Sequence, residues 1–370
     1  MREFDYSKLK ERTWDNEILA YIAQIHEYKG KQDLYLRQRP VELNRLIEIA
    51  KIQSTESSNQ IEGIVTTNSR LKQLVEDKTT PRNRDEQEIL GYRNVLNIIH
   101  ENYEAIPVRS SYILQLHGEL LKHTAFSYAG KYKTTPNEID MVLENGEKIV
   151  LFKPLEPYET PEAVECLCDE YNRAVGECVV DPLILIPNFI LDFLCIHPFN
   201  DGNGRMTRFI SSYMLSKDYD ESACLRIAYI IKGHRAIYQN IFRDTNDKRN
   251  MGDLTRFTTE FLRFFDMALD DSYQTLNEKN KQYNHYRSRL ALLLNERNVS
   301  LDNAFQNMLN SMLELELFGH SESDIKQLAS ISEKSDITVK RFFEKMGDLI
   351  LVNKHQKKYF FSINMSLLEE

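Results

Sequence analysis

The chain has 370 residues, of which 42% are hydrophobic and 28% are charged, the proportions of an ordinary globular protein. This length is too great for one small core, so two or three packed units are expected. The formal net charge of −9 argues against a general nucleic-acid coat protein, although an acidic chain can still contain one basic segment.

The N-terminal residues and the cysteines indicate a cytoplasmic protein. Residues 1–14 lack the apolar core of a secretory signal, and the longest apolar run, at 183–196, is interrupted by Pro187 and Asp192. We therefore expect no membrane segment. The five cysteines are odd in number and lack the usual spacing of zinc sites, so we expect buried free thiols.

The chain begins with a strongly helical pattern. Glycine and proline are scarce, with 13 and 10 residues, and apolar positions mostly recur at spacings of three and four, which predicts a mainly α-helical protein. An amphipathic helix is expected over 41–63, ending at Gly63. A second is expected over 84–102, and a third begins with Ser110 as its N-cap.

A strand-like stretch at 130–154 interrupts this pattern. The sequence Glu-Asn-Gly-Glu at 144–147 lies between apolar flanks and predicts the turn of a β-hairpin over about 134–153. Helical patterning resumes at Pro161 and continues to about Asn295.

The last seventy or so residues have a different pattern. Residues 321–332 and 335–348 predict two short helices, and 349–364 predict a strand, a basic turn and a strand. This order is typical of a winged helix. Its basic residues suit phosphate contacts, but interspersed acids dilute the charge, so DNA binding and protein docking both stay open. The basic residues are Lys340, Arg341, Lys345, Lys354, Lys357 and Lys358.

The densest polar motif, His-Pro-Phe-Asn-Asp-Gly-Asn-Gly-Arg at 197–205, follows the long apolar run. Asp-Gly and Asn-Gly alone would suit a chain reversal between two helices. That explanation does not account for His197 at the mouth of the turn, nor for Arg205 and Arg208 behind it. Unpaired buried charges are costly, so an anionic ligand is expected here.

Phosphate is the anion that these residues suit best. Gly202 and Gly204 allow backbone N–H groups to approach a ligand, and a helix beginning near Gly204 directs its positive end there. Arg205 adds a charge-assisted donor. Asp201 is a hard oxygen ligand suited to Mg²⁺ between two phosphates, and His197 can take a proton from a hydroxyl. Together they predict attack on a nucleotide phosphorus.

With every fixed position filled, the segment 197–208 resembles the signature of the Fic family, H-x-F-x-D/E-G-N-G-R-x-x-R. The resemblance implies a helical core and transfer of AMP from ATP to a Ser, Thr or Tyr hydroxyl of a target protein, with release of pyrophosphate. It assigns the general base to His197 and the Mg²⁺ ligand to Asp201. The other implied roles are Phe199 as loop anchor, Gly202, Asn203 and Gly204 as the phosphate nest, Arg205 on the phosphates and Arg208 on the γ-phosphate.

The hairpin lies where Fic proteins carry a flap that docks the target's backbone beside the hydroxyl to be modified. The family often has G-x-Y-R at the entrance of the flap, whereas this chain has Lys133 in the arginine position, which weakens the case for a bidentate contact there. Downstream, residues 233–242 resemble the segment that contacts adenine. Tyr238 is therefore a candidate for stacking on the base, with ordinary helix packing as the alternative.

Ahead of the motif, Ser58–Gly63 resembles the family's inhibitory pattern S/T-x-x-x-E-G/N, which implies an inhibitory helix within the same chain. Glu62 at the end of a packed helix can pair with Arg208 and take the donor that the γ-phosphate needs. ATP would then bind with its α-phosphate misplaced for in-line attack. In some family members this glutamate also supports removal of AMP, and that activity stays open here.

These features predict an N-terminal helical region over 1–100, a Fic core over 101–275, a helical linker over 276–298 and a winged-helix-like domain over 299–370. One alternative is a transcriptional regulator whose core only senses nucleotide, but a sensor needs no base, and His197 is intact. Another is a different phosphate-containing donor, such as phosphocholine or UMP, although the two arginines favour a nucleoside triphosphate.

The target protein is not readable from the sequence, and self-modification and a homodimer both stay open. The remaining histidines show no metal-ligand spacing and are expected to be structural or surface residues, among them His117, His123, His234 and His320.

Overall fold

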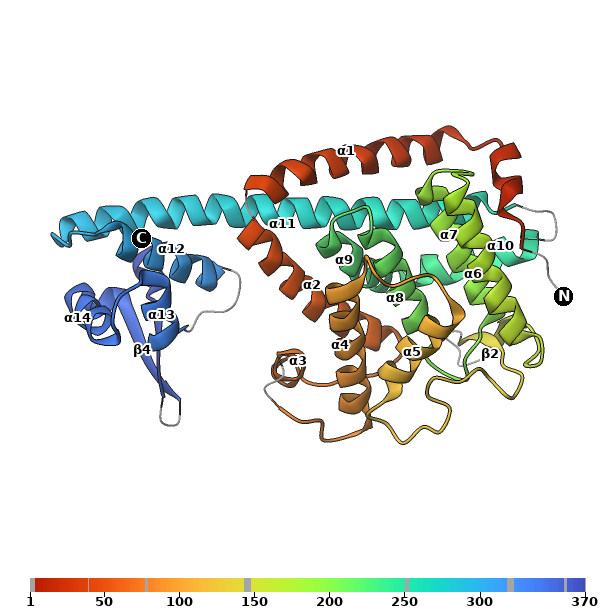
Figure 1. The fold of residues 1–370 in the computed structure, drawn as a ribbon, viewed down its shortest axis with the longest axis horizontal. Coiled ribbons are helices and arrows are strands. Elements are labelled where there is room, and N and C mark those ends of the chain that lie inside the picture. The colour runs from red at the N-terminus through yellow and green to blue at the C-terminus, as the bar shows by residue number, and fades with distance from the viewer. Residues whose placement is uncertain are drawn as a thin grey trace. The chain divides into compact units, whose positions relative to one another are not determined.

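The computed structural model describes residues 4–38, 40–76, 79–142, 148–249, 253–317, 323–355 and 358–369 (Figure 1). The fold is mainly helical, as predicted. The chain divides into two compact units, Met1–Pro40 with Ile47–Ser272 and Val41–Leu46 with Tyr273–Glu370. The finer domain boundaries given above stay predictions. In the described part of the chain, no helix combines the length and apolar character that crossing a membrane requires.

The larger unit consists of helices packed around one hydrophobic core. Its elements are η1 (Tyr6–Glu11), α1 (Asn16–Gln38), most of α2 (Pro40–Ile61), α3 (Asn68–Val75), α4 (Arg84–Asn102), α5 (Ser110–Leu121), α6 (Thr160–Gly176), α7 (Pro182–Ile196), α8 (Asn203–Ser216), α9 (Glu221–Gly233), α10 (Arg235–Arg249) and the first part of α11 (Thr255–Glu296).

Helix α7 lies at the centre of this core. Every residue from Leu183 to Ile196 is buried, and α6 and α8 pack against α7. A helix that is apolar around its whole circumference is typical of such a buried position. Asp181 caps the helix by accepting a hydrogen bond from the Leu183 N–H at 2.8 Å, and Pro182 occupies the first turn, where its missing N–H has no consequence.

Most predicted helices are present, with small differences at their ends. The helix expected over 41–63 is α2, which ends two residues earlier, and the helix expected over 84–102 is α4. The predicted cap at Ser110 is wrong, because Arg109 is the N-cap of α5 and no side chain caps it. The charged stretch near 277–298 is the second half of α11, which continues without a break.

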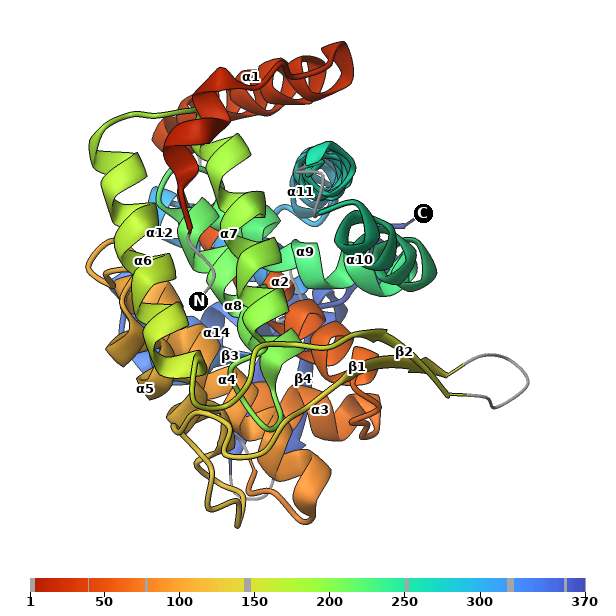
Figure 2. The same cartoon turned by 90° about the vertical axis from the view of Figure 1, so that its right-hand side faces the viewer.

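The predicted hairpin is formed by β1 (Ile139–Val142) and β2 (Lys148–Phe152), which pair antiparallel. Its register places Val142 opposite Lys148, with an irregularity next to Ile139. Figure 2 shows the two strands running side by side away from the helices. The predicted turn at 144–147 lies outside the described residues.

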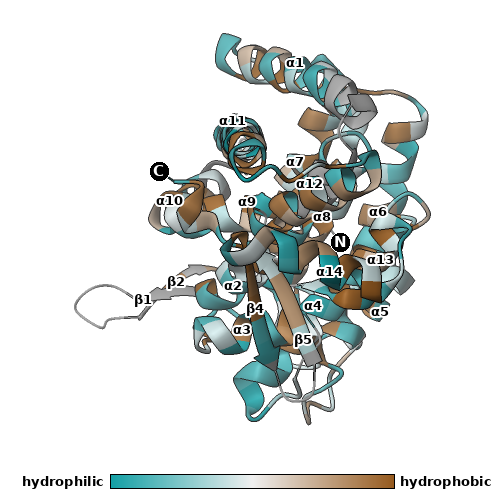
Figure 3. Ribbon diagram, turned by 90° about the vertical axis from the view of Figure 1, so that its left-hand side faces the viewer, coloured by the Kyte–Doolittle hydropathy of each residue, from teal (hydrophilic) through white to brown (hydrophobic). Residues whose placement is uncertain are grey.

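The smaller unit contains the rest of α11, the element α12 (Asn303–Leu317) and the order of helices and strands predicted above. Further elements are β3 (Ser323–Asp324), α13 (Ile325–Ser332), α14 (Asp336–Met346), η2 (Gly347–Leu349), β4 (Ile350–His355), β5 (Lys358–Ile363) and η3 (Met365–Leu367). The strands form one antiparallel sheet in the order β3-β5-β4. The sequence patterns did not predict β3. Strand β4 changes from hydrophobic to hydrophilic along its length (Figure 3).

The basic side chains predicted for this unit are exposed where the structure describes them. These are Lys340, Arg341, Lys345 and Lys354. Lys357 and the side chain of Lys358 lie outside the described part, as does His320.

The cysteines are all free, as predicted, but two of them are not buried. Cys168, Cys195 and Cys224 lie in the core, whereas Cys166 and Cys178 are exposed. Cys166 precedes the core residues Leu167 and Cys168 on α6, so it lies on the solvent side of that helix.

Helices α4 and α5 approach closely at Gly91, where an added Cβ would lie 1.9 Å from the carbonyl oxygen of Leu120. Gly91→Ala must push the two helices apart, and such overpacking typically costs about 1–3 kcal/mol. We expect the melting temperature of the full chain to fall by several degrees.

The matched control is Gly30→Ala in α1, where an added Cβ meets nothing within 4 Å. Alanine replaces glycine in a helix interior there, which should leave stability unchanged or raise it by about 0.5–1 kcal/mol. Equal decreases in melting temperature for both variants would contradict this account of Gly91.

Candidate active site

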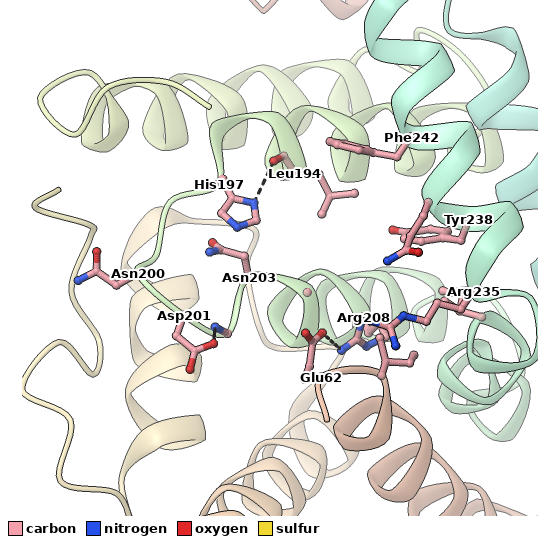
Figure 4. Close-up of a pocket in the computed structure, with 15 residues that line it drawn as sticks. Glu62, Leu194, His197, Asn200, Asp201, Asn203, Arg208, Arg235, Tyr238 and Phe242 are labelled. Carbon is pink, nitrogen blue, oxygen red and sulfur yellow. Dashed lines mark hydrogen bonds and ion pairs between the residues drawn. The ribbon is translucent and has the colours of Figure 1, made fainter. Parts of the chain in front are cut away.

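A cavity of about 380 Å³ in the larger unit collects most of the residues singled out in the sequence (Figure 4). It is lined by Ile61, Glu62, Leu194, His197, Asn200, Asp201, Gly202, Asn203, Gly204, Arg208, Ile231, Arg235, Tyr238, Gln239 and Phe242. Four of the predicted residues do not line it: Ser58, Gly63, Phe199 and Arg205. Each of these four lies just behind or beside the cavity wall, as described below.

The connection between α7 and α8 carries His197 and Asp201. It begins with His197 in the left-handed conformation, with φ 50° and ψ 62°, which turns the chain sharply at the end of α7. It ends with Gly202 at φ 85°, the N-cap of α8. Such values are uncommon for a residue other than glycine, so the surroundings must hold His197 in this conformation.

Asn203 closes this connection from within. Its side-chain oxygen accepts a hydrogen bond from the Phe199 N–H at 2.9 Å, and its amide nitrogen donates to the Phe199 carbonyl oxygen at 2.7 Å. Asn203 is 3% exposed and is the first residue of α8. An amide at this position therefore holds the loop, in addition to lining the cavity.

Phe199 fixes the loop in the core. It is fully buried and stacks on His117 with ring centroids 3.8 Å apart. His117 Nδ1 accepts a hydrogen bond from the Gly130 N–H at 3.0 Å, so Nε2 carries the hydrogen and donates to the Asp201 carbonyl oxygen at 3.0 Å. Burial lowers the pKa of His117 to about 4, which keeps it neutral. His117 is thus a structural residue, as the sequence suggested, and it supports the loop.

His197 has the tautomer that a general base needs. Its Nδ1 lies 3.4 Å from the Leu194 carbonyl oxygen, which can only accept, so Nδ1 carries the hydrogen and Nε2 is the basic nitrogen. Burial lowers the pKa of His197 to about 4; the Lys133 charge acts in the same direction and Glu62 in the opposite one. His197 is therefore neutral at pH 7 and able to accept a proton.

The end of α2 fills the anion site at the amino end of α8. Arg208 Nη2 donates to Glu62 Oε1 at 2.6 Å and to the Ser58 carbonyl oxygen at 3.1 Å, and Nε donates to Ser58 Oγ at 2.7 Å. A Cβ at Gly204 would lie 2.5 Å from the same Glu62 oxygen. The carboxylate therefore rests against the first turn of α8, where a helix attracts anions.

The backbone after α2 presents Glu62 to this site. The N–H of Glu62 donates to the Asn59 carbonyl oxygen at 3.0 Å, and Gly63 has φ 77°, which ends the helix. Burial alone would raise the pKa of Glu62, but the charge and hydrogen bond of Arg208, with Arg205 and Arg235 farther away, lower it below its ordinary value. Glu62 is therefore ionised at neutral pH.

Arg205 lies behind the cavity wall. It is 1% exposed, and its Nη1 donates to Glu88 Oε2 at 2.8 Å, while Nη2 lies 3.7 Å from Asp201 Oδ1. Glu88 also accepts a hydrogen bond from Arg84 Nε at 2.9 Å. The structure thus gives Arg205 a buried carboxylate partner on α4, and its contact with phosphates stays a prediction. Nothing in the sequence pattern distinguishes Glu88 from its charged neighbours.

The aromatic rings of Tyr238 and Phe242 form an apolar end of the cavity. Figure 4 shows them reaching in from α10, across from His197 and Asp201, with Arg235 beside Tyr238. Leu194 also lines the cavity. Burial raises the pKa of Tyr238 to about 12, so its ring stays uncharged. This end suits a planar apolar group, although the stacking role of Tyr238 stays a prediction.

Asp201 is the residue that suits a cation. Its carboxylate is 43% exposed, and its Oδ1 accepts a hydrogen bond from the Gly202 N–H at 2.6 Å. Within the described ranges, no group of three or more His, Cys, Asp or Glu side chains forms a metal site alone. One carboxylate beside an anion site fits Mg²⁺, which is usually held by one or two carboxylates together with substrate phosphates.

Comparison with known proteins places this site in a family domain. Residues 107–215, which include the whole connection between α7 and α8, match the Fic/DOC family. A segment of 113 residues is 34% identical to the ribonucleoside-diphosphate reductase small chain of Ostreid herpesvirus 1 (isolate France). It covers 28% of this chain and only 18% of that protein's length.

Solved structures share the fold. A Fic family protein from Desulfovibrio desulfuricans G20 is 16% identical, with a TM-score of 0.62 over 95% of this chain and 98% of that one. A Fic domain containing signaling protein from Bacteroides thetaiotaomicron VPI-5482 is 21% identical, with a TM-score of 0.54 over 70% and 95%. Fic-1 from C. elegans is 15% identical, with a TM-score of 0.52 over 69% and 71%. Residues 107–215 therefore form a Fic/DOC family domain within a chain that has the fold of solved Fic proteins.

Proposed function

We propose that this chain is a protein adenylyltransferase, which transfers AMP from ATP to a Ser, Thr or Tyr hydroxyl of a target protein, and that Glu62 restrains it. One observation carries the proposal: His197, Asp201 and the amino end of α8, which all belong to the Fic/DOC domain, line one cavity. A neutral base, a metal-binding carboxylate and an anion site are the parts that attack on a phosphate requires.

In the proposed reaction, the target hydroxyl gives its proton to His197 Nε2 as its oxygen bonds to the α-phosphorus. The bond from that phosphorus to the oxygen bridging the α- and β-phosphates breaks, and pyrophosphate leaves with the electron pair. Gly202 and Gly204 let the backbone N–H groups at the start of α8 hold the phosphates. Mg²⁺, when held by Asp201, would neutralise phosphate charge. The apolar end with Tyr238 would hold the adenine.

Glu62 acts in this proposal as an internal anion. It occupies Arg208 and the first turn of α8, the groups that the γ-phosphate would use, and its lowered pKa keeps it charged at neutral pH. If the inhibited state is about 99% populated, activity falls about a hundredfold, a bias of about 2.7 kcal/mol. Removal of AMP from a modified target, supported by the same carboxylate, belongs to this proposal as a second reaction.

The hairpin and the smaller unit have supporting roles in the proposal. Strands β1 and β2 would dock the backbone of the target. The order α13–α14–β4–β5 would form a winged helix, and the exposed Lys340, Arg341 and Lys345 on α14 favour a nucleotide-sensing regulator as the second candidate function. A neutral His197 facing the cavity favours catalysis over sensing alone.

Intact mass after incubation with ATP and Mg²⁺ tests transfer and restraint together. We expect Glu62→Gly to add one adenylyl group, or to label a lysate target, about a hundredfold faster than the wild type. Adding His197→Ala should abolish the signal, because the base is lost. If neither the chain nor a lysate incorporates label from ATP in any variant, the nucleotide-sensing regulator becomes the better description.

The pH profile of the Glu62→Gly variant tests the environment of His197. Because burial lowers the pKa of His197 to about 4, the base stays unprotonated as pH falls and is lost only near pH 4. The rate at pH 5.5 should therefore stay within about twofold of that at pH 7.5. A histidine with an ordinary pKa of about 6.5 would instead lose about tenfold at pH 5.5. Such a loss would contradict the buried environment described here.

A further inference from the structure

The segment before strand β1 contacts the connection that carries His197. Lys133 lies in this segment and is only 2% exposed. Its backbone N–H donates to the Pro198 carbonyl oxygen at 2.8 Å, and its Nζ donates to the Ile196 carbonyl oxygen at 3.0 Å. A lysine is rarely buried to this extent without partners that compensate its charge.

Asn137 completes these contacts. Its side-chain oxygen accepts a hydrogen bond from Lys133 Nζ at 2.9 Å. Its amide nitrogen donates to the carbonyl oxygens of His197 at 3.2 Å and Phe199 at 2.9 Å. The four successive carbonyl groups of residues 196–199 therefore all accept hydrogen bonds from the segment 133–137.

These bonds supply what the end of α7 lacks. The last carbonyl groups of a helix have no partner within the helix and carry its negative end, so a cation there is stabilising. His197 also leaves the helical conformation immediately after α7. The ammonium group of Lys133 thus compensates the helix end and holds the backbone on both sides of His197.

We propose that Lys133 is a positioning residue: with Asn137 it fixes the backbone around His197 and joins that backbone to the root of the β1–β2 hairpin. Its effect on rate rests on the proposed function, whereas its effect on the loop does not. A misplacement of about 1 Å at a reacting group can cost about a hundredfold in rate. The hydrogen bonds from Lys133 and Asn137 to the four carbonyl groups of residues 196–199, which we call the clamp, prevent such a displacement of His197.

The charge of Lys133 gives the clamp a pH dependence. Burial lowers the pKa of Lys133 to about 8, with Glu156 acting weakly in the opposite direction, and His197 is the titratable side chain that faces it from the loop. As pH rises through about 8, the ammonium loses its proton, and bonds from a neutral amine are roughly half as strong as charge-assisted ones. The clamp is therefore strongest below pH 8.

Steady-state kinetics in the full-length Glu62→Gly chain test the rate effect. Lys133→Met should lower kcat about tenfold or more while KM for ATP changes by less than about twofold, because the base is displaced and the nucleotide site is not. Lys133→Arg should keep most of the activity. In the Glu62→Gly parent, the rate should decrease as pH rises through about 8, because Lys133 loses its proton. Lys133→Arg should not show this decrease, since a guanidinium stays protonated. The control is Lys131→Met. Lys131 lies two residues away and is exposed, and its side chain donates to the Ser127 carbonyl oxygen.

Hydrogen–deuterium exchange of peptides spanning 194–203 tests the clamp without any activity. Exchange should be faster in Lys133→Met than in the wild type or Lys131→Met. Unchanged exchange together with unchanged kcat in Lys133→Met would overturn the proposal. If Lys133→Met does not fold, the pH profile of Lys133→Arg decides the question. A decrease in rate above pH 8 that is identical to that of the parent chain would overturn the proposal. Absence of transfer in the parent would refute the proposed function, while the exchange result would still decide the clamp.

Discussion

The connection between α7 and α8 sets the main constraint on this site. It places His197, Asp201 and the amino end of α8 around one cavity, and it has no repeating hydrogen bonds of its own. Buried backbone polar groups need partners, so neighbouring segments supply them. Asn203 bonds to Phe199 from within, His117 holds the Asp201 carbonyl, and Lys133 with Asn137 hold residues 196–199. The positions of His197 and Asp201 therefore depend on these contacts.

The two arginines of α8 form ion pairs that differ in burial. Arg205 pairs with Glu88, and the two side chains are 1% and 2% exposed. Removing one partner from so deeply buried a pair typically costs about 3–5 kcal/mol, so this pair is a fixed part of the framework. Arg208 pairs with Glu62, whose side chain is 36% exposed at the edge of the cavity. Water can reach that carboxylate, so the second pair is less deeply buried than the first.

Local features of the structure were largely predictable from the sequence. The spacing of apolar residues predicted α2 and α4 to within two residues, and the helix–turn–helix and hairpin order of the smaller unit was also predicted. These elements depend on neighbours in the chain and on which face is buried. Errors arose where solvent exposure or a partner decided the outcome, as for the cap at Ser110 and the exposed Cys166.

By itself, the sequence identified the motif at 197–208, because residue chemistry and motif spacing are local. The pairing of Glu62 with Arg208 was expected only from the resemblance to a known family, since the two residues lie 146 positions apart. The tertiary structure alone decided that Arg205 turns to Glu88, that His117 supports Asp201 and that Lys133 holds the backbone at Ile196. These partners lie 117, 84 and 63 positions apart in the chain. No periodicity or spacing records such pairs, since they form only when packing of the helices brings separate segments together.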